Sequence, residues 1–223
     1  MEDFGRAMNL ELFDSRPPAG ARQAIGVEAF VLRGFALPSM RELLAAIAQV
    51  ESVSPFRHMV TPGGLTMSVA LTNCGELGWV TDRRGYRYTP NDPQTAAPWP
   101  PMPESFSRLA RGAAAAAGFE GFAPDACLIN RYAPGSRLSL HQDKDERDFD
   151  APIVSVSLGV PAVFLFGGHT RRDRAQRVPL HHGDVVVWGG ADRLRYHGIL
   201  PIKDAFHPDL GTHRINFTFR KAG

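Results

Sequence analysis

One stretch of the chain, Arg137-Leu138-Ser139-Leu140-His141-Gln142-Asp143-Lys144-Asp145, decides how the rest is interpreted. Side chains along a β-strand alternate between its two faces, so a strand that ends here places Leu138 and Leu140 on one face. The other face then carries His141 and Asp143 together with Ser139. An imidazole and a carboxylate that point the same way form half of a metal site. The alternative is a surface histidine beside a solvated acidic run, because an H-x-D motif alone is common.

Such a metal site lacks a second nitrogen ligand, and we expect His197 to supply it. Two histidines and one carboxylate on one side of a metal ion leave coordination positions open for a substrate and for oxygen. That arrangement is typical of non-haem Fe(II) oxygenases.

Length and composition favour one globular domain. The chain has 223 residues, of which 43% are hydrophobic and 22% are charged, as in ordinary globular proteins. No apolar run approaches membrane-spanning length, and residues 1–5 do not resemble the start of a signal peptide. We therefore expect a cytoplasmic monomer without membrane contact. Cys74 and Cys127 are too few for a disulfide framework and are expected to be buried thiols.

Charge does not identify a partner. The net charge is +2, from 25 basic and 23 acidic residues, so the molecule as a whole is not a polycation. Nucleic-acid binding would depend on local patches, and residues 83–88 and 171–177 are the candidates. A single charge run is more often a solvated loop.

Two predicted helices precede a region rich in strands. Residues 1–23 show no clear period and are expected to form a loosely attached arm. Short strands are predicted within residues 24–35 and over 67–73. Ser39 and Glu42 have the spacing of a capping box, and apolar residues at helical spacing follow until Pro55. A second helix is predicted over 103–118, and both helices should pack outside the sheet.

Residues 75–103 combine many prolines with tryptophan, tyrosine and arginine. This composition is too aromatic for a disordered linker and too rich in proline for regular sheet. We therefore expect a long, ordered surface loop, and such loops often act as binding lids.

Short β-rich segments separated by Gly, Pro and Asp follow Pro124, and this pattern indicates a sandwich or barrel. The fold class is thus mainly β with flanking helices. The segments are 127–132, 153–158, 162–166, 184–188 and 214–220.

The last segment is the most informative strand, because Arg214 and Arg220 share its polar face with Asn216. Two arginines on an interior strand need anionic partners, since uncompensated buried charge is very costly. They lie about 20 Å apart along the backbone, so their side chains could reach inward to opposite ends of a small dicarboxylate. The alternative is an edge strand with a solvated polar face. Asn130 and Tyr132 also share a strand face, where structural hydrogen bonds are the ordinary explanation.

These parts, in this order, resemble the AlkB family of Fe(II)/2-oxoglutarate dioxygenases, which reverse N-alkylation of nucleobases. The resemblance covers about residues 24–223 and depends on an ordered set of motifs, none of which is specific alone. The motifs are residues 61–64, 67–70, 72–75, 77–79, 98–100, 124–135, 141–146, 152–159, 183–190, 196–199 and 214–220.

The resemblance implies a single dioxygenase domain over 24–223, with a nucleotide-recognition lid at about 61–103. A double-stranded β-helix, or jelly roll, would occupy about 124–223. His141, Asp143 and His197 would bind Fe(II), and O2 and 2-oxoglutarate would be co-substrates. The residues implied in 2-oxoglutarate binding are Arg214 at its distal carboxylate, Arg220 toward the metal, and Asn130, Tyr132 and Asn216.

The resemblance further implies oxidative demethylation of bases such as 1-methyladenine and 3-methylcytosine, with release of formaldehyde. The base would be flipped from a duplex or come from a single strand of DNA, or of RNA. Trp79 would stack on the base, with His141 on its other face, and Asp145 would favour a cationic base. The other implied substrate contacts are Thr61, Tyr86, Tyr88, Arg137, Lys144 and Arg171.

Two alternatives stay open: a hydroxylase of a protein or small molecule, and a metal-binding jelly roll without catalysis. Departures from the family pattern are modest. Leu71 stands where some relatives have Met, and Arg137 where some have Lys. The arginine-rich loop 168–178 is individual to this chain and could alter its preference between single- and double-stranded substrates, or between RNA and DNA. The remaining candidate histidines match no ligand position and are expected to be turn, surface or packing residues: His58, His181, His182, His207 and His213.

Overall fold

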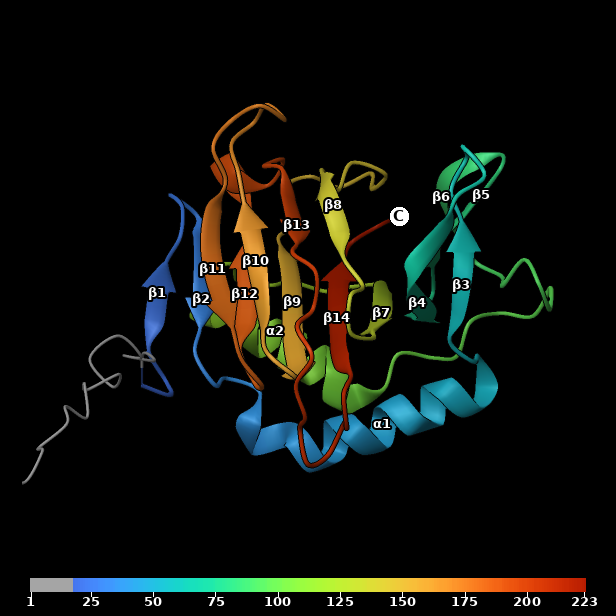
Figure 1. Cartoon of the computed structure of the whole chain (residues 1–223), viewed down its shortest axis with the longest axis horizontal. Helices are drawn as coiled ribbons and strands as arrows, with labels where there is room; N and C mark the ends of the chain where they lie inside the picture. The colour runs from blue at the N-terminus through green and yellow to red at the C-terminus, as the bar shows by residue number, and fades with distance from the viewer. Residues whose placement is uncertain (1–17) are drawn as a thin grey trace, which may run out of the picture.

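Two sheets facing each other form the body of the protein (Figure 1). The computed structural model describes residues 18–223. The large sheet has eight strands in the order β1-β2-β12-β9-β14-β7-β4-β3, and the small sheet has four in the order β11-β10-β13-β8. An apolar core that draws side chains from both sheets lies between them. The mainly β, jelly-roll fold class predicted from the sequence is confirmed.

The strands of the large sheet are β1 (Arg22–Ala24), β2 (Ala29–Leu32), β3 (Arg57–Val60), β4 (Thr66–Gly75), β7 (Ala126–Tyr132), β9 (Ile153–Gly159), β12 (Val185–Trp188) and β14 (Arg214–Arg220). Those of the small sheet are β8 (Leu138–His141), β10 (Ala162–Phe166), β11 (Gln176–Leu180) and β13 (His197–Ile199). β5 (Gly78–Asp82) and β6 (Gly85–Thr89) form a separate hairpin, called here the lid hairpin.

Two helices cover the outer face of the large sheet, as predicted. α1 (Met40–Val53) runs along the lower edge of the view in Figure 1, and α2 (Glu104–Ala116) lies behind the strands. Phe106 of α2 stacks on Phe217 of β14 with ring centroids 4.8 Å apart. The predicted capping box is wrong, because the Ser39 side chain caps no amide. The 3-10 helix η2 (Leu37–Ser39) runs directly into α1, so Ser39 lacks the extended backbone that a capping residue needs.

The lid hairpin corrects the prediction that residues 75–103 form an ordered loop without regular sheet. The two strands pair from Gly78 opposite Thr89 to Asp82 opposite Gly85. All prolines of this segment lie from Pro90 onward, so they do not interrupt the ladder. The irregular part that follows is held by a buried Trp99, whose indole N–H donates to the Thr89 carbonyl over 2.9 Å.

β14 is an interior strand, paired with β7 on one side and β9 on the other. The alternative of a solvated edge strand is therefore wrong, and both arginines of this strand are buried. β1, β3, β11 and β13 were not predicted as separate strands. β11 occupies the end of the expected 168–178 loop, and β1 begins at Arg22, inside the expected arm. The rest of that arm, residues 1–17, lies outside the described residues.

Within residues 18–223, no helix is both long and apolar enough to cross a bilayer.

Candidate metal and substrate site

His141, Asp143 and His197 meet at one end of the small sheet. β8 and β13 pair so that His141 lies opposite His197, and their ring centroids are 4.4 Å apart. Asp143 follows β8, and its carboxylate oxygens lie 3.6 Å from His141 Nε2 and 3.7 Å from His197 Nε2. Each residue thus offers one ligand atom, and these atoms lie within 4.8 Å of one another. The three residues selected from the sequence form one potential metal site.

Gly198 permits this close approach of β8 and β13. A Cβ atom at position 198 would lie 2.7 Å from the Leu138 carbonyl oxygen, a distance that real Cβ atoms do not adopt. The register of the ladder also shifts at this point. Any larger residue would push the two strands, and with them the two histidines, apart.

Backbone carbonyls determine which ring nitrogen of each histidine is available. His141 Nδ1 lies 2.8 Å from the Ser139 carbonyl oxygen, and His197 Nδ1 lies 3.0 Å from that of Arg195. A carbonyl only accepts hydrogen bonds, so both Nδ1 atoms carry the proton and both Nε2 atoms keep a lone pair toward Asp143. Burial lowers the pKa of His197 to about 4, and the adjacent His141 shifts it the same way. The His197 ring is therefore neutral at physiological pH, as a metal ligand must be.

A second cluster, His182, His207 and Asp209, has the opposite hydrogen-bond pattern. His182 Nδ1 accepts from the Gly159 N–H over 3.0 Å, and His207 Nδ1 accepts from the Asp209 N–H over 3.2 Å. A neutral ring that accepts at Nδ1 carries its proton on Nε2, so it offers no lone pair there to a metal ion. This pattern agrees with the expectation that neither histidine is a ligand.

Asp143 is held by a buried arginine. Arg220 donates to Asp143 Oδ2 from Nη2 over 2.6 Å and from Nε over 3.0 Å. Burial opposes ionisation of Asp143, but the charge of Arg220 outweighs it, so the pKa of this carboxyl lies below its usual range. The carboxylate is therefore ionised and oriented before any metal binds.

Arg214, at the other end of β14, is 1% exposed but forms no ion pair with any residue in the described part of the chain. Its Nη2 donates to Ser157 Oγ over 3.0 Å, and its Cζ lies 4.9 Å from the Tyr132 ring centroid. Nη1 is buried without a hydrogen-bond partner among residues 18–223. A buried guanidinium in this state is costly, which favours an anionic ligand beside it. Asn130 and Asn216 add amide groups nearby, 3.4 Å from each other.

The lid hairpin contacts the segment that follows the H-x-D motif. Trp79 Nε1 donates to Asp145 Oδ2 over 3.0 Å, and the Trp79 ring stacks on Tyr86 with centroids 5.7 Å apart. Tyr88, expected near a nucleotide backbone, directs its hydroxyl to Glu146 Oε1 over 2.7 Å. The aromatic rings of Trp79 and Tyr86 are therefore attached to Asp145, which lies only two residues after Asp143 in the chain.

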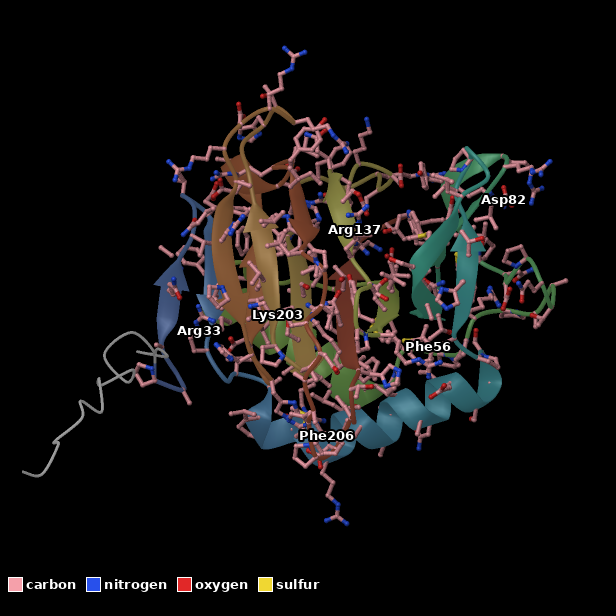
Figure 2. All side chains as sticks on the ribbon, in the orientation of Figure 1. Arg33, Phe56, Asp82, Arg137, Lys203 and Phe206 are labelled. Atoms are coloured by element: carbon pink, nitrogen blue, oxygen red, sulfur yellow. The ribbon has the colours of Figure 1, made fainter. Side chains whose placement is uncertain are left out.

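The other predicted substrate residues lie on the surface around this end. Thr61 Oγ1 accepts from the Leu65 N–H, so the structure gives it a role in the β3–β4 turn. Lys144 and Arg137 are exposed, and Arg137 lies beside β8 (Figure 2). Arg171 is exposed in the β10–β11 connection, which rises at the same end of the molecule as the lid hairpin (Figure 1).

Residues 28–220 match the family model described as the 2OG-Fe(II) oxygenase superfamily. The chain is 60% identical over 214 residues to the alpha-ketoglutarate-dependent dioxygenase AlkB of Escherichia coli, covering 96% of this chain and 98% of that protein. The chain belongs to the AlkB family. A further AlkB dioxygenase, from Salmonella typhimurium, is 62% identical over 96% of this chain and 98% of its own length. The solved structure of OsALKBH1 superposes with a TM-score of 0.80 at 29% identity, covering 90% of this chain and 100% of that chain.

Family membership makes this protein an Fe(II)- and 2-oxoglutarate-dependent dioxygenase that uses O2. The side chains of the site suit both Fe(II) and 2-oxoglutarate. Two imidazole nitrogens with free lone pairs and one carboxylate match non-haem iron, and the unpaired Arg214 Nη1 matches a carboxylate ligand.

Two buried residues beside Asp143, Glu146 and Arg193, were not predicted from the sequence as site residues. Glu146 is in ion pairs with Arg193 and Arg220, and Arg193 Nη1 also donates to the Asp143 carbonyl oxygen over 2.9 Å. Glu146 is part of an acidic run that predicts a solvated loop, whereas its side chain is buried. Residues 141–146 belong to the ordered set of family motifs, but that membership carries no information on the burial of Glu146.

Proposed function

We propose that this AlkB-family dioxygenase demethylates N-alkylated bases, such as 1-methyladenine and 3-methylcytosine, in DNA or RNA. Hydroxylation of the methyl group is coupled to decarboxylation of 2-oxoglutarate, and the product releases formaldehyde. One observation carries the choice of substrate: Trp79, stacked on Tyr86, donates to Asp145 two residues from Asp143. A flat apolar surface beside an exposed carboxylate suits a cationic base.

In this proposal His141, Asp143 and His197 bind Fe(II), which together with 2-oxoglutarate and O2 supplies the oxidising power for hydroxylation of a methyl group. Arg214 binds the distal carboxylate of 2-oxoglutarate through its unpaired Nη1. Arg220 stands at the metal end, where it also holds Asp143. The interior polar residues that assist are Asn130, Tyr132 and Asn216.

A base must leave the helical stack, or come from a single strand, to reach this interior site. Trp79 would stack on one face of the extruded base, and the partly exposed ring of His141 on the other, with Tyr86 and Tyr88 near the nucleotide backbone. Asp145 would accept from the exocyclic amine of the base and exchange its bond to Trp79 for it. Basic and polar surface residues would contact the phosphates: Thr61, Arg137, Lys144 and Arg171.

We also infer a cytoplasmic monomer. The groups that form the site all come from one chain, and Cys74 and Cys127 are free thiols, as suits a reducing compartment. Light scattering coupled to gel filtration should give the mass of one chain; a dimer would contradict the inference.

The deciding experiment supplies the protein with Fe(II), 2-oxoglutarate, oxygen and an oligonucleotide that carries 1-methyladenine. Succinate and formaldehyde should appear in equal amounts, together with unmodified adenine. If succinate forms at the same rate with and without a methylated oligonucleotide, and the lesion is not lost, the result would favour a hydroxylase of proteins or small molecules. Absence of succinate would favour a jelly roll without catalysis.

A further inference from the structure

Glu146 is a carboxylate only 6% exposed, and cationic and hydroxyl donors surround it. Its Oε1 lies 3.2 Å from Arg220 Nε and accepts from the Tyr88 hydroxyl over 2.7 Å. Its Oε2 accepts from Arg193 Nη2 over 3.3 Å. A buried carboxylate with this many donors is held in one orientation.

Both arginines connect Glu146 to the metal ligand Asp143. Arg220 bonds the Asp143 carboxylate, and Arg193 bonds the Asp143 backbone carbonyl over 2.9 Å. Arg220 is therefore held between two carboxylates, Asp143 on one side and Glu146 on the other. Two positive and two negative side chains balance in charge, so the cluster can be ordered without a counter-ion.

Tyr88 connects the same carboxylate to the lid hairpin. Tyr88 lies directly opposite Trp79 in the β5–β6 ladder, so both side chains stand on the same face of the hairpin. Trp79 bonds Asp145 and Tyr88 bonds Glu146, two neighbouring carboxylates. The Trp79 bond is exposed and a substrate can replace it, whereas the Tyr88 bond is shielded and is the more durable anchor.

We propose that Glu146 is a positioning residue that fixes Arg220 beside 2-oxoglutarate and, through Tyr88, ties the lid hairpin to the cofactor pocket. The position of the lid hairpin and the affinity for 2-oxoglutarate are then coupled, although none of the residues proposed to bind the co-substrate belongs to the lid hairpin. This inference rests on the proposed placement of 2-oxoglutarate next to Arg220.

The test is Tyr88→Phe, which removes one hydroxyl and leaves every charge of the cluster in place. In protein loaded with Mn(II), 2-oxoglutarate should bind about three- to tenfold more weakly than in the wild type, the size expected for one hydrogen bond. Amide hydrogens of the lid hairpin should exchange faster with deuterium, while those of β14 should not. In turnover, the KM for 2-oxoglutarate should rise by the same factor with little change in kcat.

Thr89→Val is the matched control. Thr89 is the next residue of β6, and its hydroxyl donates to the Asn91 carbonyl, away from Glu146. Its removal should leave 2-oxoglutarate affinity unchanged. In a Glu146→Gln background the Tyr88 bond is no longer charge-assisted, so Tyr88→Phe should then change the affinity by less than about twofold. Melting temperatures of all variants separate this effect from a general loss of stability.

Wild-type affinity and unchanged lid exchange in Tyr88→Phe would overturn the positioning role and leave the proposed function standing. Equal effects of Tyr88→Phe in both backgrounds would also overturn it, because Glu146 would not carry the connection. Failure of the wild-type Mn(II) protein to bind 2-oxoglutarate would instead overturn the proposed cofactor site itself, and this inference with it.

Discussion

At the scale of single residues, the position of one ring proton distinguishes the two histidine clusters. Backbone carbonyls hold Nδ1–H of His141 and His197, whereas backbone amides donate to Nδ1 of His182 and His207. Only the first pair therefore presents Nε2 lone pairs to a metal ion. Distance alone would have selected both clusters, so chemical competence depends on the hydrogen bond made on the far side of each ring.

His141→Ala should abolish succinate formation while leaving the fold intact. The side chain of His141 is 35% exposed, so its loss removes a metal ligand without opening a cavity in the core. Mn(II) titration followed by calorimetry should show affinity at least about 100-fold weaker, and circular dichroism should match the wild type. Full activity in this variant would refute the ligand assignment.

Arg214→Ala should raise the KM for 2-oxoglutarate by roughly 10- to 100-fold, because a charged hydrogen-bond pair to its carboxylate is lost. The KM for methylated oligonucleotide should change by less than about twofold, since Arg214 is buried in the barrel and away from the lid. Arg214→Lys keeps the charge but loses the forked geometry of the guanidinium group. Its KM for 2-oxoglutarate should therefore lie between those of the wild type and Arg214→Ala. Steady-state kinetics with each substrate varied separately provide the measurement. Equal effects on both KM values would count against the role of Arg214.

At the scale of elements, β14 serves two layers at once. Its polar face contributes Arg214, Asn216 and Arg220 to the barrel interior, and its apolar face packs on α2. This division follows from the alternation of side chains along a strand. The lid hairpin is a separate two-stranded unit that depends on contacts with its neighbours, because an isolated hairpin is marginally stable in water.

Phe217→Ala should destabilise the protein by about 3–5 kcal/mol, since it leaves a cavity between β14 and α2. Phe217 is fully buried and stacks on Phe106. Phe206→Ala removes the same kind of ring from a position where the side chain is 75% exposed, and it should change the free energy of unfolding by less than about 0.5 kcal/mol. Urea unfolding measures both. Similar losses in the two variants would argue against the packing described for β14.

Trp79→Ala should raise the KM for a methylated oligonucleotide by roughly 10- to 100-fold, the usual effect of losing one base-stacking aromatic side chain. Affinity for 2-oxoglutarate should not change. Trp79→Phe retains a ring for stacking but loses the bond to Asp145, so its KM should lie between those of alanine and wild type. An unchanged KM in the alanine variant would exclude Trp79 from the substrate surface.

At the scale of the whole molecule, the site joins segments from distant parts of the chain. The small sheet supplies the metal cluster, the large sheet supplies the arginines of β14, and the lid hairpin stands at the same end of the molecule (Figure 1). The hydrogen bond between Trp79 and Asp145 spans 66 residues, and that between Arg220 and Asp143 spans 77. Ligands that bind this site therefore hold both sheets together.

Mn(II) and 2-oxoglutarate together should raise the melting temperature by roughly 10–20 °C when each is present at about 100 times its dissociation constant. The effect arises because both ligands bind the folded state only. A chelator should reverse the shift, and His141→Ala should reduce it strongly. Differential scanning fluorimetry provides the measurement, and an unchanged melting temperature in the wild type would contradict the proposed site.

Much of this protein could be predicted from local patterns in its sequence. Alternation along residues 214–220 predicted which face of β14 is polar, and the helical spacing after Ser39 predicted α1, because these periods are properties of neighbouring residues. The H-x-D spacing likewise placed His141 and Asp143 together. His197 was expected as the second nitrogen ligand, and Arg214 and Arg220 as the groups that bind a small dicarboxylate, before any resemblance was considered. The ordered set of family motifs then identified that dicarboxylate as 2-oxoglutarate and added Asn130, Tyr132 and Asn216.

Tertiary structure alone decided the rest, since it depends on contacts between residues far apart in the chain. The interior position of β14, the burial of Glu146 and the proton positions on the histidines all follow from which strands and loops become neighbours. An acidic run has the same sequence whether water or two arginines surround it. Its chemical role is fixed only when packing excludes the water and supplies the partners.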